Sequence, residues 1–136
     1  MSTSSNQNFS QLLNAIEKGE FANVYLLYGE EDFQIQQLAE KLVETSLQPG
    51  EKDFNFDTLY ANETDAAAIV NIAMSYPMMA ERRVLLVKNL QTMHETDLQL
   101  IASYCSKASP TTLLILTATK LNGKLKSVKT LKENAV

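Results

Sequence analysis

The sequence has a single cysteine, a single histidine and no hydrophobic run long enough to cross a membrane. Cys105 has no partner for an internal disulfide, and it falls in a helical pattern in which a small buried thiol packs well. A membrane-spanning helix needs about 18 consecutive apolar residues, and no segment approaches that length. Residues 1–8 have neither the basic region nor the apolar stretch of a signal peptide. We therefore expect a cytoplasmic protein that makes no membrane contact.

Positive charge is scarce over most of the chain. Residues 1–119 hold 7 Lys and Arg against 15 Asp and Glu, a balance of −8, whereas residues 120–136 hold 5 Lys and 1 Glu, a balance of +4. The acidic part repels a phosphate backbone, while the lysine-rich end can contact one weakly or bind an acidic neighbour. Because no arginine or aromatic residue lies between these lysines, residues 120–132 are more typical of a solvated helix face than of a nucleic-acid site.

Helical patterns alternate with unbroken apolar runs, and 136 residues with 45% hydrophobic content suffice for one core. Periodic apolar positions predict helices, and apolar runs without alternation predict strands covered on both faces. The expected elements are a helix from Phe9 to near Gly19, a strand at 24–28, a helix from Asp32 to before Pro49, a strand at 54–60, a helix capped by Thr64 or Asp65 and ended by Pro77, a strand at 83–87, a helix around 98–105, a strand at 113–116 and a final lysine-rich helix. This order favours an α/β fold with a mostly parallel sheet and flanking helices, and a ligand or partner site near the carboxyl ends of the strands.

The corner between the first strand and its helix, residues 25–33, occupies the place of a nucleotide-binding loop but lacks its chemistry. A phosphate loop needs several glycines, a lysine and a Ser or Thr, whereas this corner has only Gly29 and the three carboxylates of residues 30–32. Those carboxylates repel a triphosphate, and an acidic first turn is more typical of a helix start than of a metal site.

The remaining polar residues form no catalytic constellation. His94 stands in a polar stretch without a second His or Cys nearby, and no serine lies in a nucleophile motif. We therefore expect no enzyme activity, no cofactor and no metal. A small P-loop-type nucleotide-binding enzyme and a purely structural scaffold domain stay open as alternatives.

Two adjacent methionines, Met78 and Met79, lie between a helix and a buried strand. Pro77 ends the helix before them, and the polar residues 81–83 follow. From composition alone, the pair either fills gaps under the sheet or forms an exposed docking tip.

The residues around this pair are open to two interpretations each. Tyr76 either packs against the helix end or adds a contact to the tip. Arg82 and Arg83 are expected mainly on a solvated face, although they can pair with Glu81 or the acidic body, and one of them can flank a partner.

Three stretches in order resemble the delta subunit family of the bacterial DNA polymerase III clamp loader. The first is the strand and turn at 25–33. The second is residues 74–87, which contain in order a small residue, an apolar residue, Pro, two large apolars, a small residue, an acid, two basics and a strand. The third is residues 110–116 with the lysine-rich continuation at 120–124. The resemblance covers about residues 21–133, nearly the whole chain.

The resemblance implies an amino-terminal domain with an AAA+-like, P-loop-NTPase-like sheet and a degenerate phosphate loop. Residues 1–136 are then a fragment of a longer chain, with a leading helix in 1–20 and an α/β core in 21–136. Two further domains are expected to follow.

The resemblance also implies a mechanical role in DNA replication. The family is a non-catalytic part of a DNA-directed DNA polymerase holoenzyme: it binds the beta sliding clamp and helps open this ring for loading onto primed DNA. It acts with other clamp-loader subunits, here through the missing carboxyl-terminal domains. The family's paired large apolars, often two phenylalanines, correspond to Met78 and Met79, with Tyr76 as a further clamp contact and Pro77 and Arg82 as positioning residues.

Overall fold

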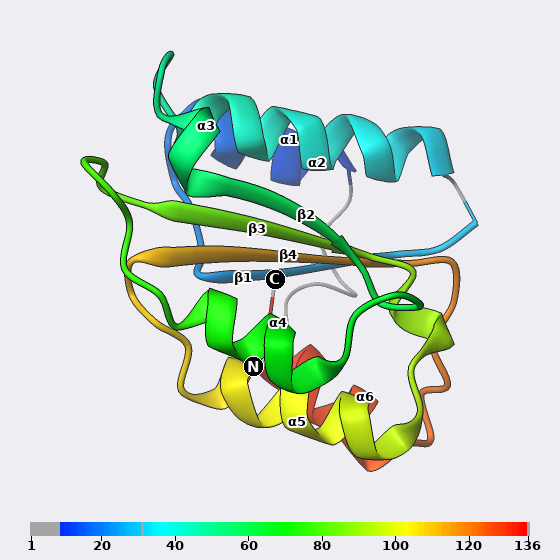
Figure 1. The fold of residues 1–136 in the computed structure, drawn as a ribbon. Coiled ribbons are helices and arrows are strands. Elements are labelled where there is room, and N and C mark those ends of the chain that lie inside the picture. The colour runs from blue at the N-terminus through cyan, green and yellow to red at the C-terminus, as the bar shows by residue number, and fades with distance from the viewer. Residues whose placement is uncertain (1–8, 31, 136) are drawn as a thin grey trace.

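A four-stranded sheet lies between two layers of helices in the computed structural model, which describes residues 9–30 and 32–135 (Figure 1). None of the helices in these ranges is long and apolar enough to span a bilayer. The elements in chain order are α1 (Phe9–Glu17), β1 (Val24–Tyr28), α2 (Asp32–Ser46), α3 (Lys52–Asn55), β2 (Phe56–Tyr60), α4 (Ala66–Ala73), β3 (Arg83–Lys88), the 3₁₀ helix η1 (Leu90–Thr92), α5 (Glu95–Ser106), β4 (Thr112–Ala118) and α6 (Lys126–Asn134).

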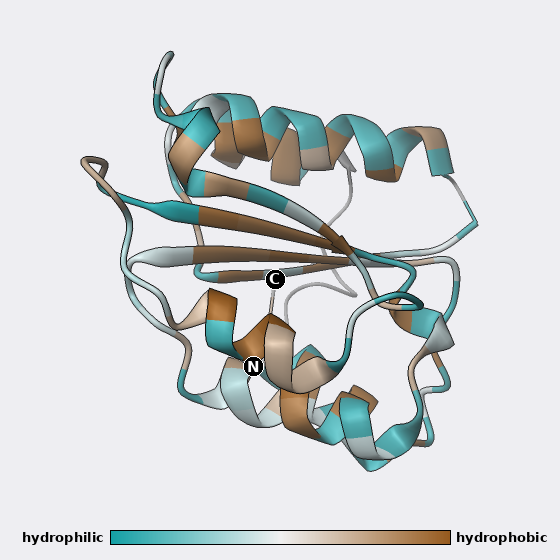
Figure 2. Ribbon diagram, viewed as in Figure 1, coloured by the Kyte–Doolittle hydropathy of each residue, from teal (hydrophilic) through white to brown (hydrophobic). Residues whose placement is uncertain are grey.

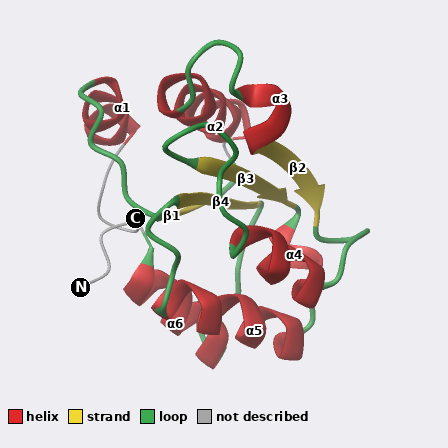
Figure 3. Cartoon of the chain, turned by 60° about the vertical axis from the view of Figure 1, so that its left-hand side comes forward, coloured by secondary structure: helices red, strands yellow, loops and turns green. Residues whose placement is uncertain are grey.

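The strand order is β1-β4-β3-β2, and each neighbouring pair is parallel. Parallel neighbours need crossover connections, which the helices supply. Helices α1 and α2 cover one face of the sheet, and α4, α5 and α6 cover the other (Figures 1 and 3). The predicted α/β fold with a mostly parallel sheet is therefore confirmed.

Two apolar clusters hold the layers together, one on each face of the sheet. Strand β3 supplies both, since Val84 and Leu86 pack toward α1 and α2 while Leu85 and Val87 pack toward α4 and α5. Strand β4 is buried along its whole length, and Figure 2 shows β3 and β4 as largely hydrophobic and the edge strand β2 as mixed. Cys105 lies in the cluster under α5, where burial raises the pKa of its thiol to about 12. It packs as the sequence predicted.

Two predicted boundaries are wrong. The strand expected at 54–60 begins at Phe56, because residues 52–55 form the short helix α3. The helix expected to run to Pro77 has its last residue at Ala73. Met74, which directly follows the helix, is 61% exposed. The choice between two caps is settled, since the side chain of Asp65 accepts a hydrogen bond of 2.8 Å from the Ala68 N–H.

Candidate functional site

The segment that joins α4 to β3 projects from the sheet at the edge where the parallel strands begin. We call residues 76–82 the methionine turn. It lies far to the left in Figure 1, beyond α3 and the start of β3. The segment precedes β3 and so lies at the amino ends of the strands, whereas the sequence predicts a ligand or partner site near their carboxyl ends.

Apolar side chains of the methionine turn face solvent. Met79 is 99% exposed, Tyr76 82% and Met78 58%. The interpretation of the two methionines as gap fillers under the sheet is thereby excluded, as is helix-end packing for Tyr76. Met79 has a φ of 54°, in the left-handed region that a residue with a Cβ seldom adopts. Residues in sparsely populated backbone conformations cluster at functional sites, and adjacent exposed apolar side chains are typical of interaction surfaces, so the turn is a candidate site.

One buried side chain from another element holds the backbone of the turn. The Met78 N–H donates to Asn55 Oδ1 at 2.6 Å, and Asn55 Nδ2 donates to the Met78 carbonyl at 2.8 Å. Within the described ranges, the backbone of residues 76–82 makes no other hydrogen bond. Pro77, half-buried beside this contact, restricts the chain further through its fixed φ.

The two arginines at the end of the turn are anchored on the sheet. The Arg82 guanidinium lies over the Phe21 ring, with Cζ 4.7 Å from the ring centroid. Arg83 Nη2 is 2.7 Å from Asp57 Oδ2. The solvated interpretation is wrong for Arg83, whose side chain is only 16% exposed and pairs with the acidic body instead.

Arg82 also lies close enough to Tyr25 to influence it. Burial raises the pKa of the Tyr25 hydroxyl, and its hydrogen bond with the Ala22 N–H and the charge of Arg82 oppose that rise. Arg82 therefore fixes the base of the methionine turn against β1 and the segment before it.

An apolar groove of about 520 Å³ runs beside the turn between α4 and α5. Met74 and Leu100, two of its exposed lining residues, come from the end of α4 and from α5, and Tyr76 belongs to both the groove and the methionine turn. The exposed apolar surface thus continues from the turn onto the helical layer.

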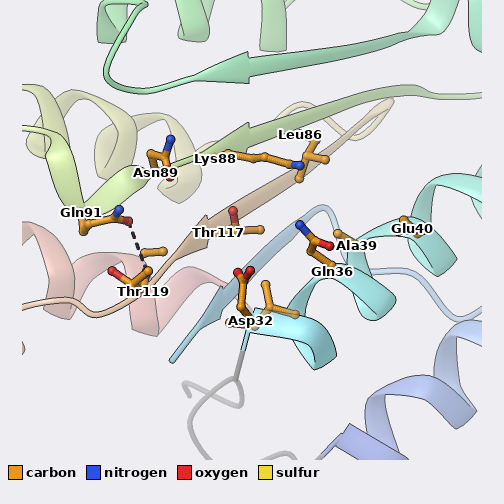
Figure 4. Close-up of a pocket in the computed structure, with 12 residues that line it drawn as sticks. Asp32, Gln36, Ala39, Glu40, Leu86, Lys88, Asn89, Gln91, Thr117 and Thr119 are labelled. Atoms are coloured by element: carbon orange, nitrogen blue, oxygen red, sulfur yellow. Dashed lines mark hydrogen bonds between the residues drawn. The ribbon is translucent and has the colours of Figure 1, made fainter. Parts of the chain in front are cut away.

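A second hollow, of about 300 Å³, lies at the opposite edge, where β3 and β4 end near the start of α2 (Figure 4). This is the region where a related nucleotide-binding fold holds phosphate. Its lining includes the carboxylates of Asp32 and Glu40 and one cation, Lys88, and Gln91 Oε1 accepts from the Thr119 N–H at 3.2 Å (Figure 4). The hollow is at the small end of ligand pockets and carries two negative charges against one positive charge.

We expect this hollow to leave ATP unbound. Mixing the 136-residue chain with ATP and magnesium in a calorimeter should give no saturable heat at about millimolar nucleotide, because carboxylates face the position of the phosphates. Tight, saturable binding would instead support the nucleotide-binding alternative.

The histidine and the acidic residues considered from the sequence form no metal-binding group among the described residues. His94 is exposed and occupies the residue before α5, where its side chain makes no capping hydrogen bond. Among the residues that the structure describes, no three His, Cys, Asp or Glu side chains gather as metal ligands would. Glu31, the middle member of the predicted acidic trio, lies outside the described residues.

The lysine-rich end forms helix α6, which is tied to the domain. Ser127, Val128 and Leu131 are buried, and the Ser127 hydroxyl donates to Glu95 of α5. That hydrogen bond is the main cause of the lowered pKa of Glu95. The exposed positions of α6 include two lysines, as expected of a solvated helix face: Lys126 and Lys129.

The parallel sheet between helical layers, with a strand-to-helix corner that lacks a phosphate loop, defines an AAA+-like α/β domain. Comparison with known proteins gives the family. The family model described as "DNA polymerase III, delta subunit" matches residues 25–136, so the chain belongs to the DNA polymerase III delta subunit family.

Individual relatives agree with this assignment. The chain is similar to DNA polymerase III subunit delta of Bacillus subtilis (strain 168), with 30% identity over 131 residues, 89% of this chain and 38% of that protein. The solved structure of the B. subtilis DNA clamp loader delta protein matches with a TM-score of 0.86 and 28% identity, over 94% of this chain and 41% of that one. The chain therefore spans about two fifths of the length of these relatives.

A more distant structure supports the fold alone. A DNA polymerase III gamma subunit-related protein of Thermotoga maritima matches with a TM-score of 0.67 at 14% identity, over 96% of this chain and 44% of that chain.

Sequence reasoning missed Asn55 as a residue of the site. It placed Asn55 in a strand, where an asparagine between two phenylalanines reads as an outward-facing residue. The hydrogen bond between Asn55 and Met78 spans 23 positions, and no pattern in the neighbouring sequence predicts it.

Proposed function

We propose that this domain is the clamp-binding part of a clamp-loader delta subunit, which binds the beta sliding clamp and helps open it for loading onto primed DNA. The observation that carries the proposal is the methionine turn: two adjacent methionines, 58% and 99% exposed, on a backbone anchored from beneath. Met78 and Met79 insert into an apolar pocket of the clamp, and Tyr76 contacts its rim. Pro77 and Arg82 fix the geometry of the turn.

The size of the apolar contact suits such a role. Burial of two methionine side chains contributes roughly 3 to 6 kcal/mol before the loss of their rotamer freedom and the cost of association. Met79 is almost wholly available for burial. Ring opening additionally requires that the domain bind the opened clamp more tightly than the closed one, since a ligand shifts an equilibrium only by its differential affinity.

The domain acts without chemistry of its own in this proposal. It is a non-enzymatic, cytoplasmic component that works with other clamp-loader subunits, while ATP is used elsewhere in the complex. The acidic lining of the hollow at the carboxyl edge supports this division of roles, because its carboxylates disfavour a bound triphosphate.

Methionine oxidation provides a footprint of the proposed contact. In the free chain, dilute peroxide should oxidise Met79 faster than the other methionines that the structure describes, because its side chain is 99% exposed. Saturating cognate clamp should slow oxidation of Met78 and Met79 at least about fivefold, as read by peptide mass spectrometry, because burial excludes the oxidant.

Met93 is the internal reference for this footprint. It is partly buried against the α5 cluster and follows η1, near the opposite edge of the sheet, so clamp should leave its oxidation rate unchanged. Equal oxidation of Met78 and Met79 with and without clamp, under conditions where the two proteins are shown to bind, would place the contact elsewhere.

A further inference from the structure

The amide of Asn55 is buried beneath the methionine turn and has all its donors occupied. The residue is 1% exposed at the end of α3, where β2 begins. One Nδ2 hydrogen goes to the Glu51 carbonyl at 3.0 Å and the other to the Met78 carbonyl at 2.8 Å, while Oδ1 accepts from the Met78 N–H. An asparagine amide has two N–H donors and one carbonyl acceptor, so this arrangement uses the whole group.

The two hydrogen bonds between Asn55 and Met78 also restrain the backbone of the methionine turn. A side chain that binds both the N–H and the carbonyl of one residue fixes that peptide segment as a neighbouring strand would. The backbone of residues 76–82 makes no other hydrogen bond in the described part of the chain, so Asn55 supplies both of the hydrogen bonds that hold this backbone.

The restraint acts directly before the strained residue. With Met78 held on both sides of its Cα, the next residue, Met79, is carried outward at a φ of 54°. Without that hold, a seven-residue loop with exposed apolar side chains has many conformations in which the methionines lie back on the surface.

We propose that Asn55 is the positioning residue of the clamp-binding turn: it preorganises Met78 and Met79 for insertion without itself touching the clamp. This inference rests on the proposed function. Its physical basis is that a loop already held in its bound conformation loses less conformational freedom on binding, which raises affinity without a new contact.

The chemistry of the site is specific for asparagine. Aspartate has the same shape but no donor, so its second oxygen would face the carbonyls of Glu51 and Met78. Alanine removes the group and leaves both Met78 partners unpaired.

Amide hydrogen exchange of the 136-residue wild-type chain, read by NMR, tests the positioning without any clamp. The Met78 N–H should exchange at least about tenfold more slowly than the N–H of Met79, which has no hydrogen bond in the described structure. In Asn55→Ala this protection should disappear. A Met78 amide that exchanges as fast as that of Met79 in the wild type would overturn the inference.

Clamp affinity supplies the functional readout. Asn55→Ala and Asn55→Asp should each weaken binding to the cognate clamp about tenfold or more, mainly through the association step. Ser127→Ala is the matched control, because it removes another buried polar side chain at α6, remote from the turn, and should bind clamp like the wild type. If Asn55→Ala retains wild-type affinity, the positioning role is wrong.

The aspartate variant adds a pH dependence that a general loss of stability would not produce. A carboxyl group at position 55 faces two carbonyls, so the protonated form, which can donate, is favoured and its pKa is raised. The defect of Asn55→Asp should therefore shrink as the pH falls toward about 5, whereas that of Asn55→Ala should stay constant. A pH-independent defect in Asn55→Asp contradicts the proposed donor role.

These outcomes separate the inference from the function on which it rests. If the wild-type chain does not bind the cognate clamp, the proposed function fails whatever Asn55 does. If the wild type and Met78→Ser with Met79→Ser bind the clamp equally, the methionine turn is not the contact, and the positioning role of Asn55 fails with it. If the methionine substitutions abolish binding while the Asn55 variants bind normally, only the positioning role fails.

Discussion

Replacement of both methionines, Met78→Ser with Met79→Ser, is expected to weaken binding of the chain to its cognate clamp by at least about hundredfold. Two methionine side chains buried in an apolar pocket contribute roughly 3 kcal/mol or more, and 1.4 kcal/mol corresponds to tenfold in affinity. The double change should leave the fold intact, because Met79 is 99% exposed and neither residue belongs to an apolar cluster. Surface plasmon resonance on immobilised clamp measures the effect.

Two further variants make this result interpretable. Phe33→Ser removes an equally large side chain that is 74% exposed, but at the start of α2, the opposite edge of the sheet. It should bind the clamp like the wild type. Met78→Phe with Met79→Phe, which introduces the two phenylalanines that the resemblance often implies at this pair, should retain or strengthen binding. Undiminished affinity of the double serine variant would remove the methionine turn as the contact.

The sheet could be predicted from the sequence because its strands are locally unambiguous. The run at 113–116 has no polar position, which is typical of a strand buried on both faces, and β4 is buried throughout. Strand β2 was harder, because it is an edge strand with only partial burial. Its predicted start included Phe54 and Asn55, whose helical conformation is coupled to a distant contact with Met78.

The residues alone indicated the candidate site as a pair of methionines, and the family resemblance added three of their neighbours. Two large apolar side chains after a helix-ending proline are visible in the sequence, but their exposure is not, since Met74 fits the same apolar pattern. The anchors depend on long-range geometry: Arg82 contacts Phe21, 61 positions away, and Arg83 pairs with Asp57. The second contact follows from the order of strands in the sheet, which places β2 beside β3. The first joins the start of β3 to the segment before β1, two strands away in the sheet.

Leu85→Ala is expected to destabilise the domain by about 2 to 5 kcal/mol, the range for a fully buried leucine. Leu85 is 0% exposed on the inner strand β3, and it packs in the cluster under α4 and α5. The substitution leaves a cavity between two layers that are both fixed by other contacts, so the surroundings can collapse only in part. The free energy of unfolding from urea titration, followed by far-UV circular dichroism, measures the loss.

Leu59→Ala is the matched control for the loss of stability in Leu85→Ala, since it makes the same chemical change on the neighbouring strand, β2. Leu59 lies on the edge strand β2, opposite Val87 of β3, and is only partly buried against the same cluster. Its loss should cost clearly less, about 1 to 2 kcal/mol, because part of the side chain already contacts water. Equal costs at the two positions would mean that β2 is as tightly packed as β3. That result would contradict the structure, in which Leu85 is fully buried on the strand that follows the methionine turn and Leu59 is only partly buried.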